Sequence, residues 1–413
     1  MTPLRSHRDF RVIGTGDAVS QFGSQITAFI LPLLAVTTLR ASGAEIGLLQ
    51  AAYLAPFLVV PLLAGVWLDR RTKRPVLIVT DLLRFALVAS IPVTAWLGLL
   101  SMSAVYVVAV IGGAMTVVYD IAATSYLPAL LPAAQLPAAN SALVVNQAVA
   151  GTGGPGVAGW LSQLFGSANT LVFDALSYLV SAASLLLVRH REQRPGRPAQ
   201  RSVRKELGDG LRAVLGRPAI LAVTLHAGCY NAGAALMNVA YLIYFVRDLH
   251  HSGAQYGLVL VAGGTGAIAG AVLAPALMRR LGAGHAFGFV VVFSTVTYFV
   301  LPVSRGGPAG IVLGALAFTV GGAGASAGSV IAVTMRQQLT DPAVYARMNA
   351  AYRLFSVGLM TIGAAVSGLI ADQVGARTAL CIAPLVLMAS TVPLYTRHVR
   401  GIGRLDSELR GAS

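Results

Sequence analysis

Long stretches without a charged residue dominate the chain, and short charged segments separate them. Ten such stretches run over 18–39, 46–68, 85–119, 121–173, 219–246, 254–278, 286–304, 306–335, 354–371 and 378–396. A membrane-spanning helix needs about 20 apolar residues, so every stretch can hold at least one helix. Two stretches are long enough for more, and clusters of proline and glycine near 98–103, 128–137 and 166–169 indicate the turns that divide them.

This pattern predicts twelve membrane-spanning helices. Their approximate ranges are 11–38, 45–68, 75–98, 103–127, 139–165, 168–189, 219–246, 253–278, 285–303, 307–335, 346–371 and 376–396. The charged segment 202–215 is predicted as a short surface helix instead. The first ten residues carry no secretory cleavage pattern, so we expect no signal peptide to be removed. The sequence therefore predicts an all-α polytopic membrane protein.

The composition agrees with a membrane protein and excludes other classes. Hydrophobic residues make up 56% of the chain and charged residues 11%, whereas soluble domains average about 25% charged residues. Two cysteines, Cys229 and Cys381, are too few for a secreted disulfide-bonded scaffold. The net charge of +15 could suggest nucleic acid. Proteins that bind nucleic acid spread such charge over a polar fold, however, so nucleic acid is excluded as a partner.

The basic residues are distributed unevenly between the two sides of the membrane. An even number of helices places both ends of the chain on one side, and 24 of the 30 lysines and arginines fall on that side. Four fall on the opposite side, and two lie inside predicted helices. Because cytoplasmic loops carry the excess of basic residues, we expect a multi-pass protein of the plasma membrane with both termini in the cytoplasm.

Two parts of the sequence repeat each other. The segment SGAEIGLL at 42–49 recurs as SGAQYGLV at 252–259, an offset of 210. Farther along, an offset of 209 pairs Asn140 with Asn349, Gly154 with Gly363, Val157 with Val366, Gly159 with Gly368 and Gly166 with Gly375. The predicted parts are an N-terminal six-helix half (1–189), a basic cytoplasmic linker with a short surface helix (190–217), a C-terminal six-helix half (218–398) and a cytoplasmic tail (399–413). Parallel halves with a site between them imply alternating access by rocking.

The segment 65–75, GVWLDRRTKRP, resembles the signature loop of the major facilitator superfamily, Gly-x-x-x-Asp-Arg-x-Gly-Arg-Arg/Lys. The matching residues are Gly65, Asp69, Arg70, Lys73 and Arg74, and Thr72 replaces a glycine. The resemblance implies that this loop latches the two halves in the outward-open state. It also implies that an acid of the helix predicted over 103–127, Asp120, holds Lys73. The alternative is that these bases only set the topology.

The segment 154–159, GPGVAG, resembles the antiporter motif of exporters in the same superfamily, Gly-Pro-x-x-Gly-Gly. The motif residues are Gly154, Pro155, Ala158 (in place of a glycine) and Gly159. The resemblance implies a seal against passive leak and favours efflux, while the alternative is ordinary glycine-mediated helix packing.

Nearly the whole chain resembles macrolide and enterobactin exporters of this superfamily, as in FRVIGTGDAVSQFGSQ near the start and QLTDPAVYARMNAAYR near the end. This resemblance implies twelve helices in two pseudo-symmetric six-helix bundles and a drug:proton antiporter. It further implies a monomer that needs no cofactor, because the proton gradient drives it.

Charged residues inside predicted helices are costly and are candidates for function. Asp17, Asp81, Asp120 and Arg353 are each predicted roughly 10 Å from the cytoplasmic helix ends, with Arg84 somewhat deeper. Asp81 and Arg84 are three residues apart, so they can pair on one helix face. The proton-coupling candidates are Asp17, Asp81, Arg84 and Arg353, and we expect Asp17 to carry the proton. The alternative is a static ionic gate.

Two other buried polar residues have simpler interpretations. Asp174 is interpreted as a structural partner within the protein. His226 could titrate near neutral pH, but a hydrogen-bonded structural histidine is the simpler reading.

The resemblance places a substrate cavity at the midplane of the membrane. Its candidate residues are Gln25, Phe29, Met115, Tyr230, Asn231, Asn238 and Thr319, with helix packing as the alternative for each. Aromatic and methionine surface with few polar groups suits a bulky amphiphilic ligand. No acid is predicted at the midplane, so a strongly cationic substrate is less favoured.

These patterns favour a proton-coupled exporter of a lipophilic or natural-product-like small molecule, of drug, macrolide or siderophore type. The alternatives are a solute importer of the same fold, a non-transporting membrane sensor and a membrane-embedded enzyme. The chain has no HExxH and no GxxxxGK[ST] motif, so neither a zinc protease nor an ATP-driven pump is indicated. We therefore predict no catalytic residues and no metal ligands. The resemblance to exporters implies a role in multidrug resistance.

Overall fold

A computed structural model describes residues 7–68, 70–190, 192 and 203–400. Every secondary-structure element within these residues is a helix. The chain forms two compact units, and each contains a short segment from the other half of the sequence. Unit 1 comprises residues 1–41, 52–200 and 252–261, and unit 2 comprises residues 42–51, 201–251 and 262–413.

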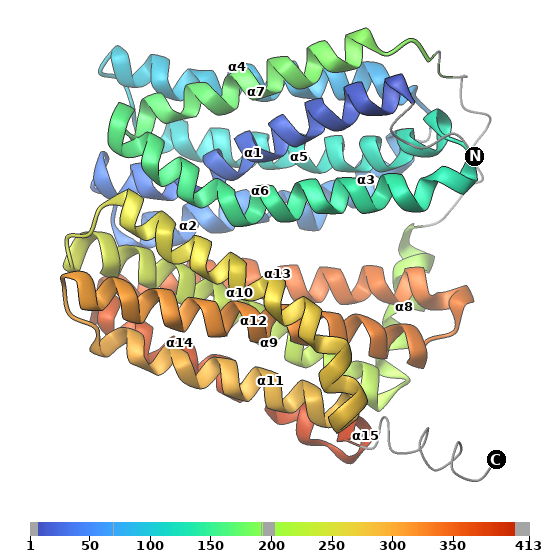
Figure 1. The fold of residues 1–413 in the computed structure, drawn as a ribbon, viewed down its shortest axis with the longest axis vertical. Coiled ribbons are helices and arrows are strands. Elements are labelled where there is room, and N and C mark those ends of the chain that lie inside the picture. The colour runs from blue at the N-terminus through green and yellow to red at the C-terminus, as the bar shows by residue number, and fades with distance from the viewer. Residues whose placement is uncertain (1–6, 69, 191, 193–202, 401–413) are drawn as a thin grey trace. The chain divides into compact units, whose positions relative to one another are not determined.

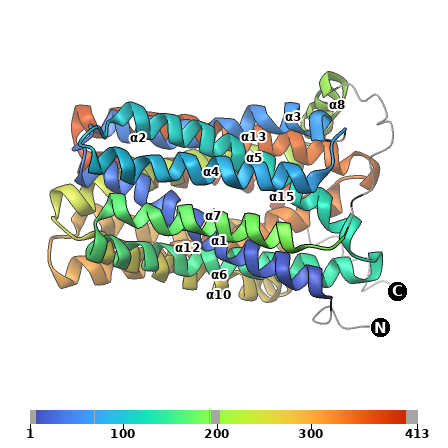
Figure 2. The same cartoon turned by 90° about the horizontal axis from the view of Figure 1, so that it is seen from above.

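Unit 1 contains most of the first half of the chain (Figure 1). Its helices are α1 (Arg8–Thr37), the end of α2 (Gly43–Leu54), α3 (Pro56–Leu68), α4 (Lys73–Trp96), α5 (Met102–Leu130), the short η2 (Ala133–Gln135), α6 (Leu136–Phe165), α7 (Ser167–Leu187) and the start of α10 (Gly253–Leu281). Helix α1 packs against α6 and α7, and α4 packs against α5 and α7. Figure 2 shows α1, α6 and α7 side by side.

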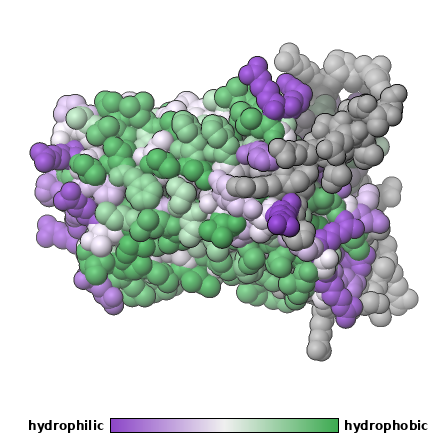
Figure 3. Space-filling view, turned by 90° about the horizontal axis from the view of Figure 1, so that it is seen from below, coloured by the Kyte–Doolittle hydropathy of each residue, from purple (hydrophilic) through white to green (hydrophobic). Residues whose placement is uncertain are grey.

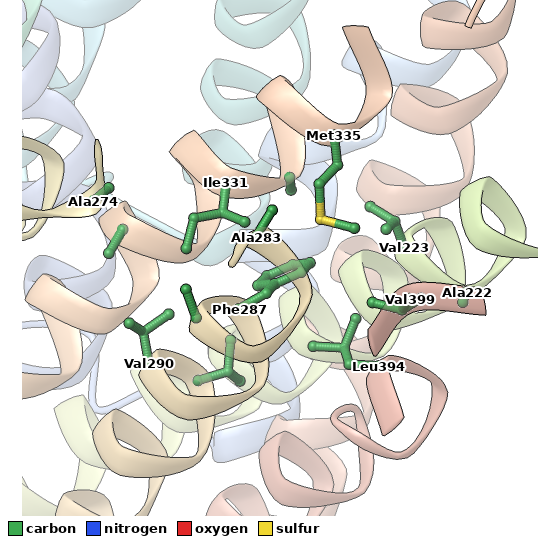
Figure 4. Close-up of a cluster of buried hydrophobic side chains, with 14 residues drawn as sticks. Ala222, Val223, Ala274, Ala283, Phe287, Val290, Ile331, Met335, Leu394 and Val399 are labelled. Atoms are coloured by element: carbon green, nitrogen blue, oxygen red, sulfur yellow. The ribbon is translucent and has the colours of Figure 1, made fainter. Parts of the chain in front are cut away.

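Unit 2 contains most of the second half. Its helices are the start of α2, α8 (Val203–Leu215), α9 (Pro218–Ile243) with η3 (Tyr244–Asp248), the rest of α10, α11 (Ala283–Thr297) with η4 (Tyr298–Val303), α12 (Pro308–Leu339), α13 (Pro342–Val374), α14 (Ala376–Ala389) with η5 (Val392–Tyr395), and α15 (Arg397–Arg400). Helix α9 packs against α13 and α14, and α11 packs against α12. Buried side chains of α9, α11 and α12 form an apolar core around Phe287 (Figure 4).

Each of the twelve predicted spans corresponds to helical structure in the described residues. The span predicted over 45–68 is divided into α2 and α3 just before Pro56, whose ring nitrogen cannot donate a helical hydrogen bond. Eleven helical segments are long and apolar enough to cross a membrane. Helix α6 has 30 residues and is not one of the eleven, because polar residues such as Asn140, Asn146 and Gln147 lower its hydropathy. The chain is a multi-pass membrane protein.

The outer surface of the helices is apolar. Large hydrophobic side chains such as Leu63, Leu186 and Val272 are exposed, at 69%, 63% and 73%. Figure 3 shows hydrophobic side chains over most of the face in view, with hydrophilic ones gathered toward its ends. Lipid contact accounts for apolar side chains that water would not favour.

The internal repeat is visible as the same contact made twice. In unit 1, a Cβ on Gly159 of α6 would lie 2.6 Å from the main-chain oxygen of Gly253 of α10. In unit 2, a Cβ on Gly368 of α13 would meet the main-chain oxygen of Gly43 of α2 at 2.1 Å. The offsets found in the sequence pair Gly159 with Gly368 and Gly43 with Gly253. Both contacts need glycine, because any side chain would clash with backbone.

Candidate functional site

A buried ion pair lies at the centre of unit 1. The guanidinium of Arg84 lies 2.5 Å from the carboxylate of Asp81, and the two side chains are 3% and 0% exposed. The rings of Tyr119 and Tyr178 lie 4.2 and 4.4 Å from the guanidinium carbon. The predicted pairing of Asp81 with Arg84 is therefore confirmed, and the two tyrosine faces add cation–π stabilisation that the sequence did not reveal.

Hydroxyl groups surround this ion pair. The Tyr178 hydroxyl lies 3.1 Å from the Ser24 Oγ, and the Tyr119 hydroxyl lies 3.3 Å from the Ser181 Oγ. A small cavity of about 20 Å³ is lined by Arg84, Tyr178 and Ser24 among others. Among the described lining residues, Arg84 brings the only formal charge into it.

Asp174 lies fully buried on α7 beside the same helices. Its carboxylate accepts hydrogen bonds from the hydroxyls of Thr27 and Ser177. The approach of α7 to α1 requires Gly23, because a Cβ there would lie 2.3 Å from the Asp174 Oδ1. The contacts of Asp174 are those of a structural partner that joins α1 to α7.

Asp17 has a different environment from the other two acids. It is half-buried on α1, and amide groups contact its carboxylate. Asn146 Nδ2, on α6, donates to Asp17 Oδ2 at 3.3 Å and also to the Gly14 carbonyl at 3.2 Å. Gln21 Nε2 donates to Asp17 Oδ1 at 3.5 Å. Among the described residues, no basic side chain lies within ion-pair distance of Asp17.

The other two charged residues that the sequence predicted inside helices are not buried. Asp120 of α5 and Arg353 of α13 are exposed, and Arg353 belongs to unit 2. Of the five charged residues predicted inside these helices, two therefore form a buried ion pair, one is half-buried and two are exposed.

The basic loop between α3 and α4 is tied to α7 and to the segment after it. Lys73 Nζ donates to the carbonyls of Leu68 and Arg71, both at 2.7 Å. Arg74 Nε donates to the Leu185 carbonyl of α7 at 2.9 Å. The Glu192 carboxylate accepts from the main-chain N–H of Lys73 at 2.6 Å, at the first turn of α4.

The other residues of this loop contribute less to the described structure. Arg70 is exposed, Gly65 lies in α3, and Asp69 lies outside the described residues. The sequence indicated the basic side chains of the loop, whereas it gave no sign of Glu192.

The glycines of the predicted antiporter motif lie where α6 approaches other helices of unit 1. A Cβ on Gly154 would lie 2.5 Å from the Gln25 Cβ of α1. The main-chain oxygen of Pro155 would lie 2.5 Å from a Cβ on Gly257 of α10. Ala158 is fully buried. The motif is therefore a close-packed surface toward both α1 and α10.

The predicted cavity residues fall into different surroundings. Tyr230 and Asn231 line one pocket in unit 2 together with His226. Phe29 is buried and stacks on Tyr256, with ring centroids 5.4 Å apart. Gln25 faces Gly154, the Thr319 hydroxyl donates to main-chain carbonyls, Met115 is half-buried and Asn238 is exposed. Within unit 2, Tyr230 and Asn231 thus line the same pocket.

Asp372 of α13 makes a helix-capping contact that the sequence pattern did not predict. Its carboxylate accepts hydrogen bonds from the main-chain N–H groups of Gly43, at 2.6 Å, and Ala44, at 2.8 Å. These donors lie in the first turn of α2, where N–H groups have no partner within the helix. Negative charge is also favourable at a helix N-terminus, so Asp372 joins α13 to α2 within unit 2.

The described residues offer no metal site or hydrolase nucleophile. They contain no group of three His, Cys, Asp or Glu side chains placed to hold a metal ion. The sequence GASAG at 324–328 has the spacing of a hydrolase nucleophile motif, but it lies inside the continuous helix α12. Such a nucleophile requires a sharp strand-to-helix turn.

Comparisons with known structures identify the fold. The nucleoside transporter NupG aligns with a TM-score of 0.74 at 16% identity, covering 94% of this chain and 100% of that one. A bacterial homologue of the iron transporter ferroportin, in an inward-facing state, aligns with a TM-score of 0.72 at 16% identity, covering 95% and 100%. A bacterial homologue of the lysosomal transporter Spinster gives 0.69 at 12% identity, covering 95% of both chains. The chain therefore has the major facilitator fold, as predicted.

Sequence comparisons find a family profile but no curated relative. No curated protein matches the sequence. The structures named above are transporters rather than enzymes. The profile of the transmembrane secretion effector family matches residues 1–411. With nearly the whole chain matched and the fold that of membrane transporters, the protein is a member of the transmembrane secretion effector family.

Proposed function

We propose that the protein exports a lipophilic, natural-product-like small molecule across the plasma membrane in exchange for protons. The contact between Asp17 and Asn146 carries this proposal. A carboxylate that only amides contact has no basic side chain within ion-pair distance to hold it ionised, so among these acids it is the one best suited to take up and release a proton. Asp81, by contrast, is held by Arg84.

The position of Asn146 links this acid to the antiporter motif. Asn146 lies on α6, the same helix that carries Gly154, Pro155, Ala158 and Gly159. A movement of α6 relative to α1 would break the hydrogen bond to Asp17 and change the hydration of its carboxylate. Protonation and helix movement are thereby coupled, which is the requirement for exchange of a proton for a substrate.

The loop residues 65–75 complete the proposed cycle as a conformational latch. Its charged members are Asp69, Arg70, Lys73 and Arg74, with Asp120 of α5 as the acid that holds Lys73. Arg74 and Glu192 support the latch, because they anchor the start of α4 to the end of α7. The excess of basic residues on one side supports cytoplasmic termini. The proposed transporter is a monomer without a cofactor, and macrolide- or siderophore-like molecules are its candidate substrates.

Transport into vesicles of known orientation tests the direction and the coupling. Inverted membrane vesicles carrying the protein are acidified inside and exposed to a panel of dyes and macrolide antibiotics. We expect uptake that disappears when a protonophore removes the gradient. Uptake only into right-side-out vesicles would establish import, and uptake insensitive to the protonophore would exclude proton exchange.

A further inference from the structure

A pocket inside unit 2 is not explained by the proton-coupling residues. It has a volume of about 200 Å³ and is bounded by α9, α11, α12 and α13. Its lining includes His226, Tyr230, Asn231, Phe287, Gly328 and Tyr352. The pocket therefore lies within one bundle of helices.

His226 lines this pocket, and only one of its two ring nitrogens has a hydrogen-bond partner among the described residues. The side chain is only 5% exposed, and its Nδ1 lies 2.9 Å from the carbonyl oxygen of Ser390. A carbonyl oxygen can only accept, so Nδ1 carries the proton and Nε2 of the neutral ring is an acceptor. Among the described residues no group donates to Nε2. Nε2 can therefore accept a hydrogen bond from a ligand that carries an N–H or O–H group.

The walls of the pocket are aromatic. The ring of Phe287 meets His226 edge-on at a centroid distance of 4.9 Å, and the ring of Tyr230 lies at 5.5 Å. Figure 4 shows Phe287 held among the apolar side chains of unit 2. The ring of Tyr352, which also lines the pocket, has the Arg336 guanidinium 3.5 Å from its centre. A flat aromatic ligand suits these walls, while the nearby positive charge and the absence of an acid in the described lining oppose a cation.

The two repeats differ at the position beside this pocket. The 209-residue offset pairs Gly328 with Tyr119 and Ser390 with Ser181. In unit 1, Tyr119 carries a buried ring at this position, and its hydroxyl lies 3.3 Å from the Ser181 Oγ. In unit 2, Gly328 has no side chain, and His226 contacts Ser390 instead.

Gly328 is not required by close helix packing. A Cβ there would lie 3.4 Å from Phe287, an ordinary contact, whereas a Cβ on Gly324 would lie 2.1 Å from Ser294. The space beside Gly328 is therefore kept open without a packing reason.

We infer that this pocket binds an uncharged aromatic molecule that carries an N–H or O–H group, which donates to Nε2 of His226. The inference rests on the proposed function and names the substrate class for it. Tyr230 and Phe287 contact the ring of the ligand, and Asn231 is available for a second polar group.

Binding of two matched probes to the purified, detergent-solubilised protein tests this inference without any gradient. The probes are 5-fluoroindole, which has an N–H donor, and 5-fluoro-1-methylindole, which lacks it. Fluorine NMR line broadening of each probe gives its dissociation constant. We expect the wild-type protein to bind 5-fluoroindole about fivefold more tightly, as the loss of one neutral hydrogen bond predicts. Equal affinity for the two probes would overturn the inference.

Three variants locate the site. His226→Ala should bind both probes equally, and Gly328→Leu should fill the pocket and bind neither. Gly151→Leu is the matched control, because a Cβ on Gly151 meets no atom within 4 Å, and it should bind as the wild type does. Size-exclusion profiles and melting temperatures confirm that each variant folds. Unchanged discrimination in His226→Ala would overturn the site, because the alanine has no acceptor.

Failure of the binding site and failure of the proposed function give different results. A protein that discriminates between the probes but shows no gradient-driven transport retains the site and loses the exporter proposal. A protein that transports but binds both probes equally loses the site alone.

Discussion

The side-chain amide of Asn146 donates a hydrogen bond to the carboxylate of Asp17 across 3.3 Å, and it donates to the Gly14 carbonyl of the same helix at 3.2 Å. One residue of α6 thus contacts both the main chain of α1 and the acid on it. This arrangement makes the environment of Asp17 depend on the position of α6. The proposed exchange of protons for substrate depends on that relationship.

Removal of the Asn146 amide should uncouple the acid from α6. In Asn146→Leu, Asp17 loses a hydrogen bond, and we expect the number of protons moved per substrate to fall by at least half. A pH-sensitive dye inside proteoliposomes measures proton movement after substrate is added. Gln147→Leu is the matched control, since the neighbouring Gln147 is exposed. Normal coupling in Asn146→Leu would contradict the role of this hydrogen bond.

The Asp81–Arg84 pair should behave as a unit in stability. Arg84→Met or Asp81→Leu alone leaves one buried charge without its partner, which costs about 3–5 kcal/mol. The double variant leaves no buried charge, so its free energy of unfolding should lie closer to the wild type than that of either single variant. Denaturation of the four proteins in mild detergent gives the double-mutant cycle. Additive losses would contradict the pairing.

Substitution of Gly159 should distinguish a seal from simple packing. A Cβ there would lie 2.6 Å from a main-chain oxygen of α10, so Gly159→Ala must separate the two helices. If α6 seals the transport path, passive proton leak through proteoliposomes should rise severalfold in the absence of substrate. Gly151→Ala, at an open position of the same helix, should not leak. Lower stability without any leak would support packing alone.

Asp372 should stabilise the start of α2. Asp372→Ala removes an acceptor from two main-chain N–H groups, and loss of such a cap costs about 1–2 kcal/mol. The melting temperature in detergent should fall, and amide hydrogen exchange at Gly43 and Ala44 should accelerate. Gln373→Ala, one residue along α13, is the control. Unchanged exchange at Gly43 would show that the cap contributes nothing.

The fold could be predicted from the sequence because a membrane span leaves a strong local signal. Uninterrupted apolar stretches define the helices, and the two glycine-rich repeats fix the symmetry that the Gly159 and Gly368 contacts display. The Asp81–Arg84 pair was also predictable, since both residues lie on one helix face and their spacing determines the contact.

The surroundings of the charged residues depend on contacts between distant segments, which the sequence pattern does not encode. Tyr119 and Tyr178 come from α5 and α7 to enclose Arg84 on α4. Asp372 lies far along the chain from the helix that it caps. In the sequence, His226 is an isolated histidine. In the structure, the Ser390 carbonyl fixes its tautomer and Gly328 leaves space beside it.

The central claim is that Asp17 carries the exchanged proton, and one measurement tests it most directly. Substrate uptake driven by an imposed pH gradient is compared in proteoliposomes containing the wild type, Asp17→Asn and Asp17→Glu. We expect Asp17→Asn to lose gradient-driven uptake while it still exchanges substrate down a concentration gradient, and Asp17→Glu to keep part of the driven uptake. Gradient-driven uptake by Asp17→Asn at the wild-type rate would contradict the account.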